Sequence, residues 1–565
     1  MKRFNLAVLA LSMIALGALL YAQANRDLPT LIQAGATKQA LEQIRAGADV
    51  NQAQGDGSSP LLWAINRSDY EVAAALLAKK ANPNAGNEFG ALPLTEAARL
   101  NDDRMVKLLM DAGAKVDSAN PDDETVLMLA IKNGNQAMFE MLVGAGANIN
   151  ITEKFHNQTP LMYAASAGRA EMVKLLLAKG ADIKPRSLYT DWPSQVTSEP
   201  RVQYRSVGAL NALMFAIRNG CYSCVEQLVA AGADINFPTP EGVTPLMLAL
   251  DNEHNEVAKF LMDKGANFDV WDWWGRTALW IAVDRKPAPG AGATPLGGGG
   301  FGGGAGAAKG GQAKGGGPGA AKGGPGRGAA AVARDPNAPP PVSSMDMIKA
   351  LLDKGADPNV EMNFHRPNAP GRGRFGDNQV STGTTALFRA VQLEDIEVAD
   401  LLLKKGANPN INSMGYTPFG IIAGAGPNGR GGGGGQFNMA LLDLLAQHGA
   451  DVNAKISGTL SFSFHIGYGN SNDGVNSKEG TTALHEAART GRLDLVRYLV
   501  DRGADVNLLD GEGKRALDLV GVARGAAAAN GPAGPAAKGK GPAGPNQATL
   551  AEIRTLLQAA AAKKP

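Results

Sequence analysis

The sequence predicts an all-α repeat solenoid, a stack of about twelve helix-turn-helix units joined by finger-like loops. Three observations carry this prediction. A phrase of the form Gly-Ala-Asp-x-Asn occurs eleven times, at intervals of 33 or 34 residues or at longer intervals that contain an insertion. A second phrase, Thr-Pro-Leu or a close variant, recurs with the same spacing. Two short apolar segments lie between the phrases, and neither can bury its apolar side chains alone, so neighbouring copies must stack.

Residues 159–183, TPLMYAASAGRAEMVKLLLAKGADI, show how one copy is built. Thr159 can cap the first helix, and Pro160 suits the first helical position because it lacks an N–H group. The second segment, 171–180, carries apolar residues at helical spacing and ends at Gly180, which is a common helix terminator. Each copy therefore predicts two short helices followed by an extended loop.

The period, the T-P-L turn, the Ala-Ala-x-x-Gly helix junction and the terminal G-A-D-x-N phrase together resemble the ankyrin repeat. The resemblance covers most of residues 25–565. It implies a stack of ankyrin helix-turn-helix units that binds a protein partner on its concave surface of finger tips and first helices. One departure lies in the turn, where only His485 supplies the histidine typical of the family. We expect this change to weaken local polar bridging and to leave the fold intact.

The insertions divide the chain into predicted parts. These are an N-terminal array at 25–285 with a finger insertion at 185–207, a Gly/Ala/Pro/Lys-rich insertion between two helices at 286–342, a C-terminal array at 343–524 with insertions at 360–381, 424–435 and 455–478, a Gly/Ala/Pro insertion at 525–548, and a C-terminal capping helix at 549–565. The Gly-rich segments offer little apolar area to offset ordering, so we expect disorder there.

The N-terminus predicts a signal peptide at 1–24. A short basic region precedes an apolar run at 6–20, which is too short for a typical membrane span. Cleavage after Ala24 would leave Asn25 as the mature N-terminus, while an uncleaved signal anchor is the alternative. We expect an exported protein, periplasmic or secreted, with no transmembrane segment after signal removal.

The sequence offers little catalytic chemistry. The net charge of +2 gives no general attraction to nucleic acid, and the six histidines are scattered. Cys221 and Cys224 can form a local disulfide or pack as small apolar residues; a redox role is the third reading, because a helix start lowers a thiol pKa. We expect no enzyme activity, no cofactor, no bound metal and no small-molecule substrate.

The stretch WDWWGRTALW, 271–280, holds four of the six tryptophans. Trp273, Trp274 and Arg276 fall at a finger tip, whereas Trp280 takes the place of the turn histidine and is expected inside. Exposed tryptophans at a tip are typical interface anchors, although packing against a neighbouring finger would also explain them. Other candidate tip contacts are Phe155, His156, Gln158, Met414 and Tyr416.

The favoured function is an exported, non-catalytic scaffold that binds an unknown protein partner. The alternative is an envelope-associated structural protein whose cationic Gly-rich loops bind an anionic polymer. Ionic strength separates the two, because polymer binding weakens steeply with salt. A thiol-active protein using both cysteines is a third hypothesis.

Overall fold

The computed structural model describes residues 27–190, 207–287, 335–362, 383–413, 415–425, 438–457, 479–522 and 546–563. These residues form an all-α repeat solenoid of paired helices, with one short pair of strands, β1 (Tyr189–Thr190) and β2 (Val207–Gly208). They group into two compact units: unit 1 holds residues up to Tyr189 and Gly208–Asp234, and unit 2 holds Thr190–Val207 and the residues from Ile235 onward. The sequence had placed its division at the 286–342 insertion instead.

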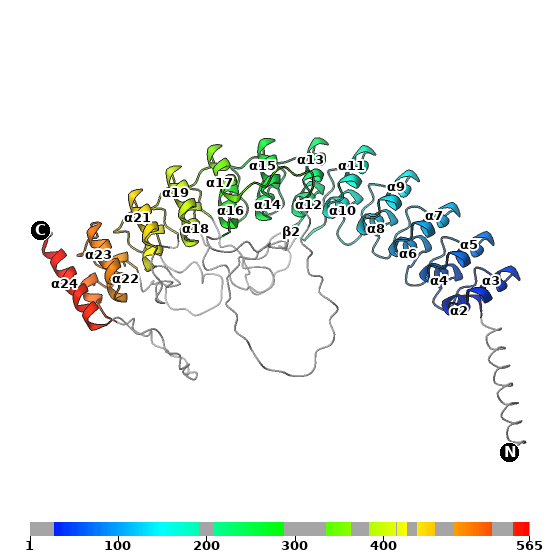
Figure 1. The fold of residues 1–565 in the computed structure, drawn as a ribbon, viewed down its shortest axis with the longest axis horizontal. Helices are drawn as coiled ribbons and strands as arrows, with labels where there is room; N and C mark the ends of the chain where they lie inside the picture. The colour runs from blue at the N-terminus through cyan, green and yellow to red at the C-terminus, as the bar shows by residue number, and fades with distance from the viewer. Residues whose placement is uncertain are drawn as a thin grey trace, which may run out of the picture. The chain divides into compact units, whose positions relative to one another are not determined.

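Unit 1 contains six helix pairs, and Figure 1 shows them as successive hairpins. In each pair the first helix is called inner and the second outer. The pairs are α2 (Leu28–Gln33) with α3 (Thr37–Arg45), α4 (Pro60–Asn66) with α5 (Tyr70–Ala78), α6 (Pro93–Arg99) with α7 (Asp103–Asp111), α8 (Val126–Asn133) with α9 (Gln136–Gly144), α10 (Pro160–Ser166) with α11 (Ala170–Ala178), and α12 (Ala212–Asn219) with α13 (Tyr222–Ala230).

Unit 2 contains six further pairs within its described residues. They are α14 (Pro245–Asp251) with α15 (Asn255–Asp263), α16 (Ala278–Arg285) with α17 (Ser344–Asp353), α18 (Ala386–Gln392) with α19 (Ile396–Lys404), α20 (Pro418–Gly420) and the π-helix η1 (Ile421–Ala425) with α21 (Met439–Gln447), α22 (Ala483–Thr490) with α23 (Leu493–Asp501), and the 3₁₀-helix η4 (Ala516–Leu519) with α24 (Gln547–Lys563).

Several predicted boundaries shift. The capping helix α24 begins at Gln547 rather than 549, and a 3₁₀ turn stands where its partner helix was expected. Residues 335–342 have a defined place, and the backbone oxygen of Val342 accepts a hydrogen bond from Asn255. Residues at the edges of the other predicted insertions are described as well, whereas 191–206, 288–334, 363–381, 426–435, 458–478 and 525–545 lie outside the described residues, and the disorder predicted for two insertions is untested.

The helices begin where the sequence predicts because the N-cap side chain caps most of the inner helices. The Thr159 hydroxyl accepts the N–H of Met162 at 3.3 Å, and Thr277 does the same for Trp280 at 3.2 Å. Leu161 and Leu176, one from each helix of a pair, are fully buried between neighbouring pairs. Stacking of such apolar faces supplies most of the stability of a repeat array.

The G-A-D-x-N phrase recurs because its last residue joins adjacent repeats. The Asn51 side-chain oxygen accepts the N–H of Asn82 at 2.8 Å, and Asn84 does the same for Lys115. The bond survives long insertions, since Asn453 accepts the N–H of Asp505 across 52 residues at 2.7 Å. The Asn of the G-A-D-x-N phrase therefore makes a hydrogen bond to the next repeat, in addition to the turn that the phrase forms.

His485 makes the polar bridge that the other turns lack. Its Nδ1 accepts the N–H of Thr482 at 3.2 Å, and its Nε2 lies 3.1 Å from the carbonyl oxygens of Leu508 and Lys514. Burial lowers the pKa of His485 despite those carbonyls. The neutral ring thus ties the turn to the next finger, and repeats without this histidine keep their fold, most of them with a Thr, Ser, Asn or Asp cap.

Lys80 stands where other repeats place glycine after an outer helix, and its φ is +66°. We expect Lys80→Gly to raise the free energy of unfolding by about 1 kcal/mol, because glycine avoids the left-handed penalty of a side chain. Urea unfolding followed by circular dichroism measures the change. Lys79→Gly is the matched control, since its φ of −94° gives glycine no such advantage. Equal effects of the two substitutions would contradict the explanation.

Candidate partner-binding surface

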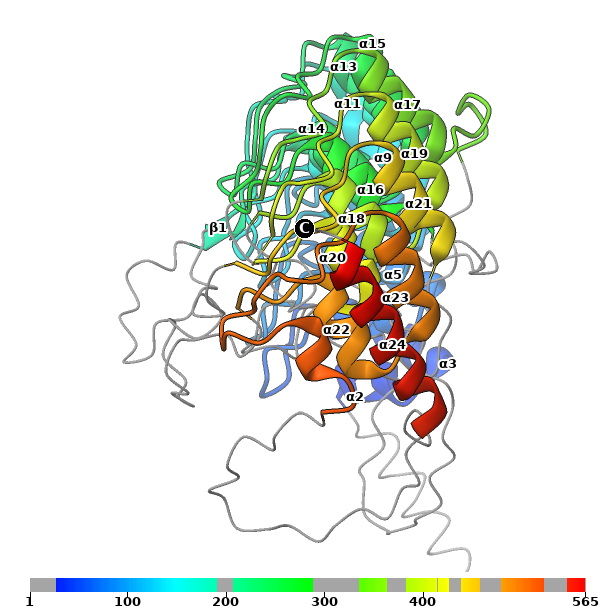
Figure 2. The same cartoon turned by 90° about the vertical axis from the view of Figure 1, so that its left-hand side faces the viewer.

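Finger loops project to one side of the helices, as Figure 2 shows. One polar side chain fixes each turn: the Asn87 oxygen accepts the N–H groups of Phe89 and Ala91, at 3.1 and 2.9 Å. A backbone bond then ties a finger to its predecessor, as between the N–H of Glu88 and the oxygen of Asp56 at 3.0 Å. The fingers therefore offer a firm platform for side chains at their tips.

Most large apolar side chains that are exposed in the described residues lie on these fingers. They are Phe89, Phe155, Leu188 and Tyr189 in unit 1, and Phe237, Trp271, Trp273 and Leu509 in unit 2. A large apolar side chain left in water on a rigid loop is a common feature of interaction surfaces. Each unit thus carries its own candidate surface.

The WDWW finger presents a different pair of tryptophans from the predicted one. Trp271 is 61 % exposed and Trp273 is 54 % exposed, whereas Trp274 is only 6 % exposed. Trp271 is bridged to Thr277, and the N–H of Gly275 donates to the oxygen of Asp272 at 2.8 Å, so Trp273 and Trp274 lie in the tight turn between the bridged residues, where Trp273 faces out and Trp274 faces in. Trp274 is therefore an interior residue, as is Trp280, which was expected inside.

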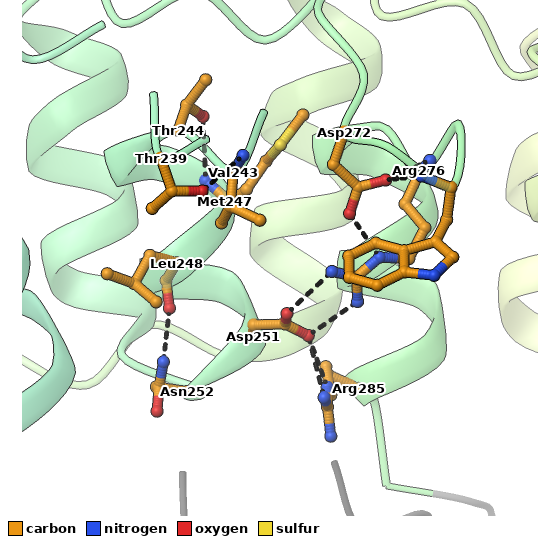
Figure 3. A network of polar contacts seen from close by, with 11 residues as sticks. Thr239, Val243, Thr244, Met247, Leu248, Asp251, Asn252, Asp272, Arg276 and Arg285 are labelled. Atoms are coloured by element: carbon orange, nitrogen blue, oxygen red, sulfur yellow. Dashed lines mark hydrogen bonds and ion pairs between the residues drawn. The ribbon is translucent and has the colours of Figure 1, made fainter. Parts of the chain in front are cut away.

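A buried ion-pair network supports this finger (Figure 3). The Nε atom of Arg276 lies 2.7 Å from the carboxylate of Asp272, and another guanidinium nitrogen lies 3.1 Å from Asp251 at the end of α14. Arg285, from α16, reaches the same Asp251 carboxylate at 2.8 Å. The Arg276 guanidinium also stands 5.1 Å from the centre of the Trp274 ring. Arg276 is 5 % exposed, so this predicted tip contact is interior as well.

The charges in this network act on one another strongly. Burial alone would raise the pKa of Asp251, but the charges of Arg276 and Arg285 and their hydrogen bonds outweigh it and hold that pKa below its ordinary value. For Asp272 burial prevails, and its pKa is raised. Arg276 stays charged because both carboxylates outweigh its own burial and raise its pKa. The network is thus a set of charges held apart from water.

The network leaves the outside of the finger nearly free of charge. Asp272 also accepts the N–H groups of Trp274 and Arg276, which closes the turn. The N–H of Trp273 then donates to the oxygen of Glu241 in the preceding finger at 2.8 Å. Phe237 is exposed on that preceding finger. We call Phe237, Trp271 and Trp273 the tryptophan patch.

Unit 1 has a comparable group that the sequence reading found only in part. Phe155 is 55 % exposed, His156 is also exposed, and Gln158 is half-buried. The N–H of Leu188 donates to the oxygen of His156 at 2.6 Å, which brings the exposed Leu188 and Tyr189 onto the neighbouring finger. These two residues were missed because they lie at the start of the predicted 185–207 insertion.

Tyr416 does not belong to the surface. It is 2 % exposed and packs with Phe388, Ile456 and Ile421. Tyr416 precedes the capping Thr417, as Arg276 precedes Thr277, and both side chains at this position are buried. The prediction of Tyr416 as a tip contact is therefore wrong for this structure. Met414 lies outside the described residues.

Cys221 and Cys224 form a disulfide at the start of α13. Cys221 caps this helix, and its sulfur accepts the N–H of Cys224 at 3.2 Å. Cys221 is 6 % exposed and Cys224 is fully buried. A thiol that exchanges disulfides needs access to its partner, so this site suits a structural role better than a redox one.

Two further searches concern only the described parts of the chain. They contain no group of three or more His, Cys, Asp or Glu residues that could hold a metal ion. None of their helices has the length and apolar character needed to cross a membrane. The predicted signal peptide at 1–24, with its cleavage between Ala24 and Asn25, lies outside these residues.

The ion-pair network predicts that removing the charge of Asp251 strongly lowers the stability of the fold. Asp251→Asn should lower the free energy of unfolding by about 3 kcal/mol, because two buried guanidinium groups lose the carboxylate they share. Urea unfolding of the full chain measures this. Asp263→Asn is the control: Asp263 pairs with Lys259 at 2.8 Å on an exposed face, where the loss should be about 0.3 kcal/mol. Similar losses in both variants would refute the importance of burial.

Comparison with known proteins agrees with this geometry. A family model described as "Ankyrin repeats (3 copies)" matches residues 31–120, 102–187 and 213–288, one described as "Ankyrin repeats (many copies)" matches 467–520, and one described as "Ankyrin repeat" matches 382–413. Repeats of this type indicate protein partners and an interaction scaffold.

The similarity to individual proteins covers only part of each chain. The chain is 28 % identical over 177 residues to alpha-latrocrustotoxin-Lt1a of Latrodectus tredecimguttatus, covering 31 % of this chain and 9 % of the toxin. It is 33 % identical over 133 residues to the putative palmitoyltransferase ZDHHC13 of Danio rerio, covering 24 % of this chain and 18 % of that protein. The chain thus spans less than a fifth of the length of either relative.

A solved structure, that of the human ASB11 ankyrin repeat domain, aligns with 43 % of this chain and 99 % of its own, at 23 % identity and a TM-score of 0.34. The family-model matches extend from residue 31 to residue 520 and include segments of both compact units. The chain belongs to the ankyrin-repeat family.

Proposed function

We propose that this protein is an exported, non-catalytic scaffold that binds a protein partner through its fingers and inner helices. Trp271 and Trp273 are the main anchors in this proposal. The observation that carries it is the exposure of both indoles, 61 % and 54 %, on a finger whose own charged groups are buried.

Physical reasoning favours these residues as anchors. Tryptophan is enriched among residues that dominate binding energy, because its large ring loses much apolar surface to a partner. The finger is already held by the Asp272–Arg276 pair and by the bond from Trp273 to Glu241, so little further ordering is needed on binding. A rigid, uncharged aromatic tip fits an apolar area on a protein partner.

Unit 1 offers a second contact area of the same kind. Phe155, His156, Leu188 and Tyr189 lie on two fingers that a backbone hydrogen bond joins. The two areas are treated as separate anchors, each carried by its own compact unit.

Export is proposed from two features. The N-terminal sequence has the basic region, apolar run and small residues of a signal peptide. The Cys221–Cys224 disulfide suits an oxidising compartment. N-terminal sequencing of the protein from the producing cell is expected to begin at Asn25, and a protein that retains Met1 would contradict cleavage.

The binding proposal predicts a loss that depends on two residues. In a pull-down from the envelope fraction, Trp271→Ala/Trp273→Ala should reduce capture of the partner by about 30-fold or more, since an anchor residue commonly contributes over 2 kcal/mol. Quantitative mass spectrometry of the captured proteins gives the ratio. Ile396→Ala is the matched control and should leave capture unchanged, because Ile396 is an exposed apolar residue, 38 % exposed, that lies on α19 and not on a finger.

Salt separates this function from the alternative. Aromatic-anchored capture should change little between about 0.05 M and about 0.5 M salt, whereas an anionic polymer held by cationic loops should be released. Capture that survives the double tryptophan substitution but disappears in salt would replace the proposed function with polymer binding.

A further inference from the structure

In unit 2 the sequence does not by itself determine which inner helix packs against α16. Inner helices α16 and α18 pack against each other, yet two long insertions separate them in the chain. The apolar faces of ankyrin repeats resemble one another, so long connections would let a later repeat take the place of the correct one. Something must select α18 as the neighbour of α16.

Two buried ion pairs join the repeats on either side of the insertions. Asp284, near the end of α16, accepts a hydrogen bond from Nε of Arg389 in α18 at 2.8 Å, and the side chains are 3 % and 11 % exposed. Lys286, just after α16, lies 2.6 Å from Asp395, which caps α19, and these side chains are 15 % and 5 % exposed. Both contacts are nearly closed to water, where a missing partner is costly.

Among the described inner helices, only α18 carries a positive charge at the position that faces Asp284. Arg389 is the fourth residue after the N-cap of its inner helix. The other inner helices of the described residues carry at this position Leu31, Trp63, Glu96, Leu129, Tyr163, Phe215, Leu248, Ile281, Ile421, Glu486 and Leu519. No other arginine or lysine occurs there, so α18 is the one described inner helix with a cation at this position.

Wrong neighbours would be penalised. If α20 stacked on α16, Ile421 would face the buried Asp284, and the ion pair with Arg389 would be lost. If α22 did so, Glu486 would place a second carboxylate beside it. These penalties act only on incorrect orders, whereas the apolar faces accept all of them.

We propose that the Asp284–Arg389 and Lys286–Asp395 ion pairs determine which repeat stacks on which across the insertions. Their role is in the order of the stack rather than in its stability. A buried ion pair is commonly no more stabilising than apolar residues of similar size, so stability alone gives little reason to place charges here.

The test separates order from stability by cross-linking. In the full chain, Asp353→Cys/Lys405→Cys reports the correct order, because these exposed side chains are 2.7 Å apart and join α17 to α19. Asp353→Cys/His448→Cys reports a skipped repeat, since His448 follows α21 as Lys405 follows α19. A bismaleimide links the free thiols after refolding from urea and leaves the buried Cys221–Cys224 disulfide in place. Peptide mass spectrometry identifies the link.

The decisive variant is Asp284→Leu/Lys286→Met/Arg389→Leu, which keeps Asp395 as a helix cap. It should remain helical, while the yield of the 353–405 link falls by about threefold or more and the 353–448 link appears, because apolar contacts no longer discriminate between repeats. The charge-swapped Asp284→Arg/Arg389→Asp should restore the correct link. Lys259→Ala/Asp263→Ala, an exposed pair in α15, is the control and should leave both links unchanged.

Two results would overturn the proposal. One is a wild-type yield of the 353–405 link in the apolar variant. The other is a charge swap that gives no more of this link than the apolar variant does.

Discussion

No helix pair in this chain can bury its own apolar side chains, and the rest of the structure depends on that constraint. Each pair is two short helices with apolar residues on both faces, so a neighbour on each side is required. The last pair shows the requirement clearly, because α24 buries Leu550, Ile553 and Leu557 on one side and leaves its other residues exposed or half-buried. The caps, finger turns and inter-repeat asparagine bonds serve to align faces that must meet.

Polar residues in this protein divide into two kinds with different tasks. Asparagine and aspartate in the turns satisfy backbone N–H groups, and they recur with the repeat. The buried arginines, Arg276 and Arg389, contact carboxylates of the preceding repeat. The first kind builds every repeat alike, and the second makes particular repeats different. Function and order in a repetitive chain both require such differences.

The fold was predictable from the sequence because periodicity averages over many copies, so that a substitution such as Lys80 for glycine does not hide the pattern. The site was predictable only in part. Trp273 and Trp274 are neighbours in a tight turn closed by Asp272, and only the geometry of that turn decides that Trp273 is exposed and Trp274 is buried. The Asp251–Arg276 contact joins residues of different repeats, and no local pattern encodes it. Tyr416 had a tip-like sequence context but fills the core, since aromatic residues suit both environments.

The asparagine bond between repeats has a consequence for how such a chain can change. The same geometry joins residues 31 apart in uninterrupted repeats and 49 or 52 apart where an insertion intervenes. The advance from one repeat to the next is therefore independent of how much chain lies in the loop. New segments can be gained, lost or replaced at these places over evolution without altering the scaffold, and a protein engineer could use the same places to display foreign peptides.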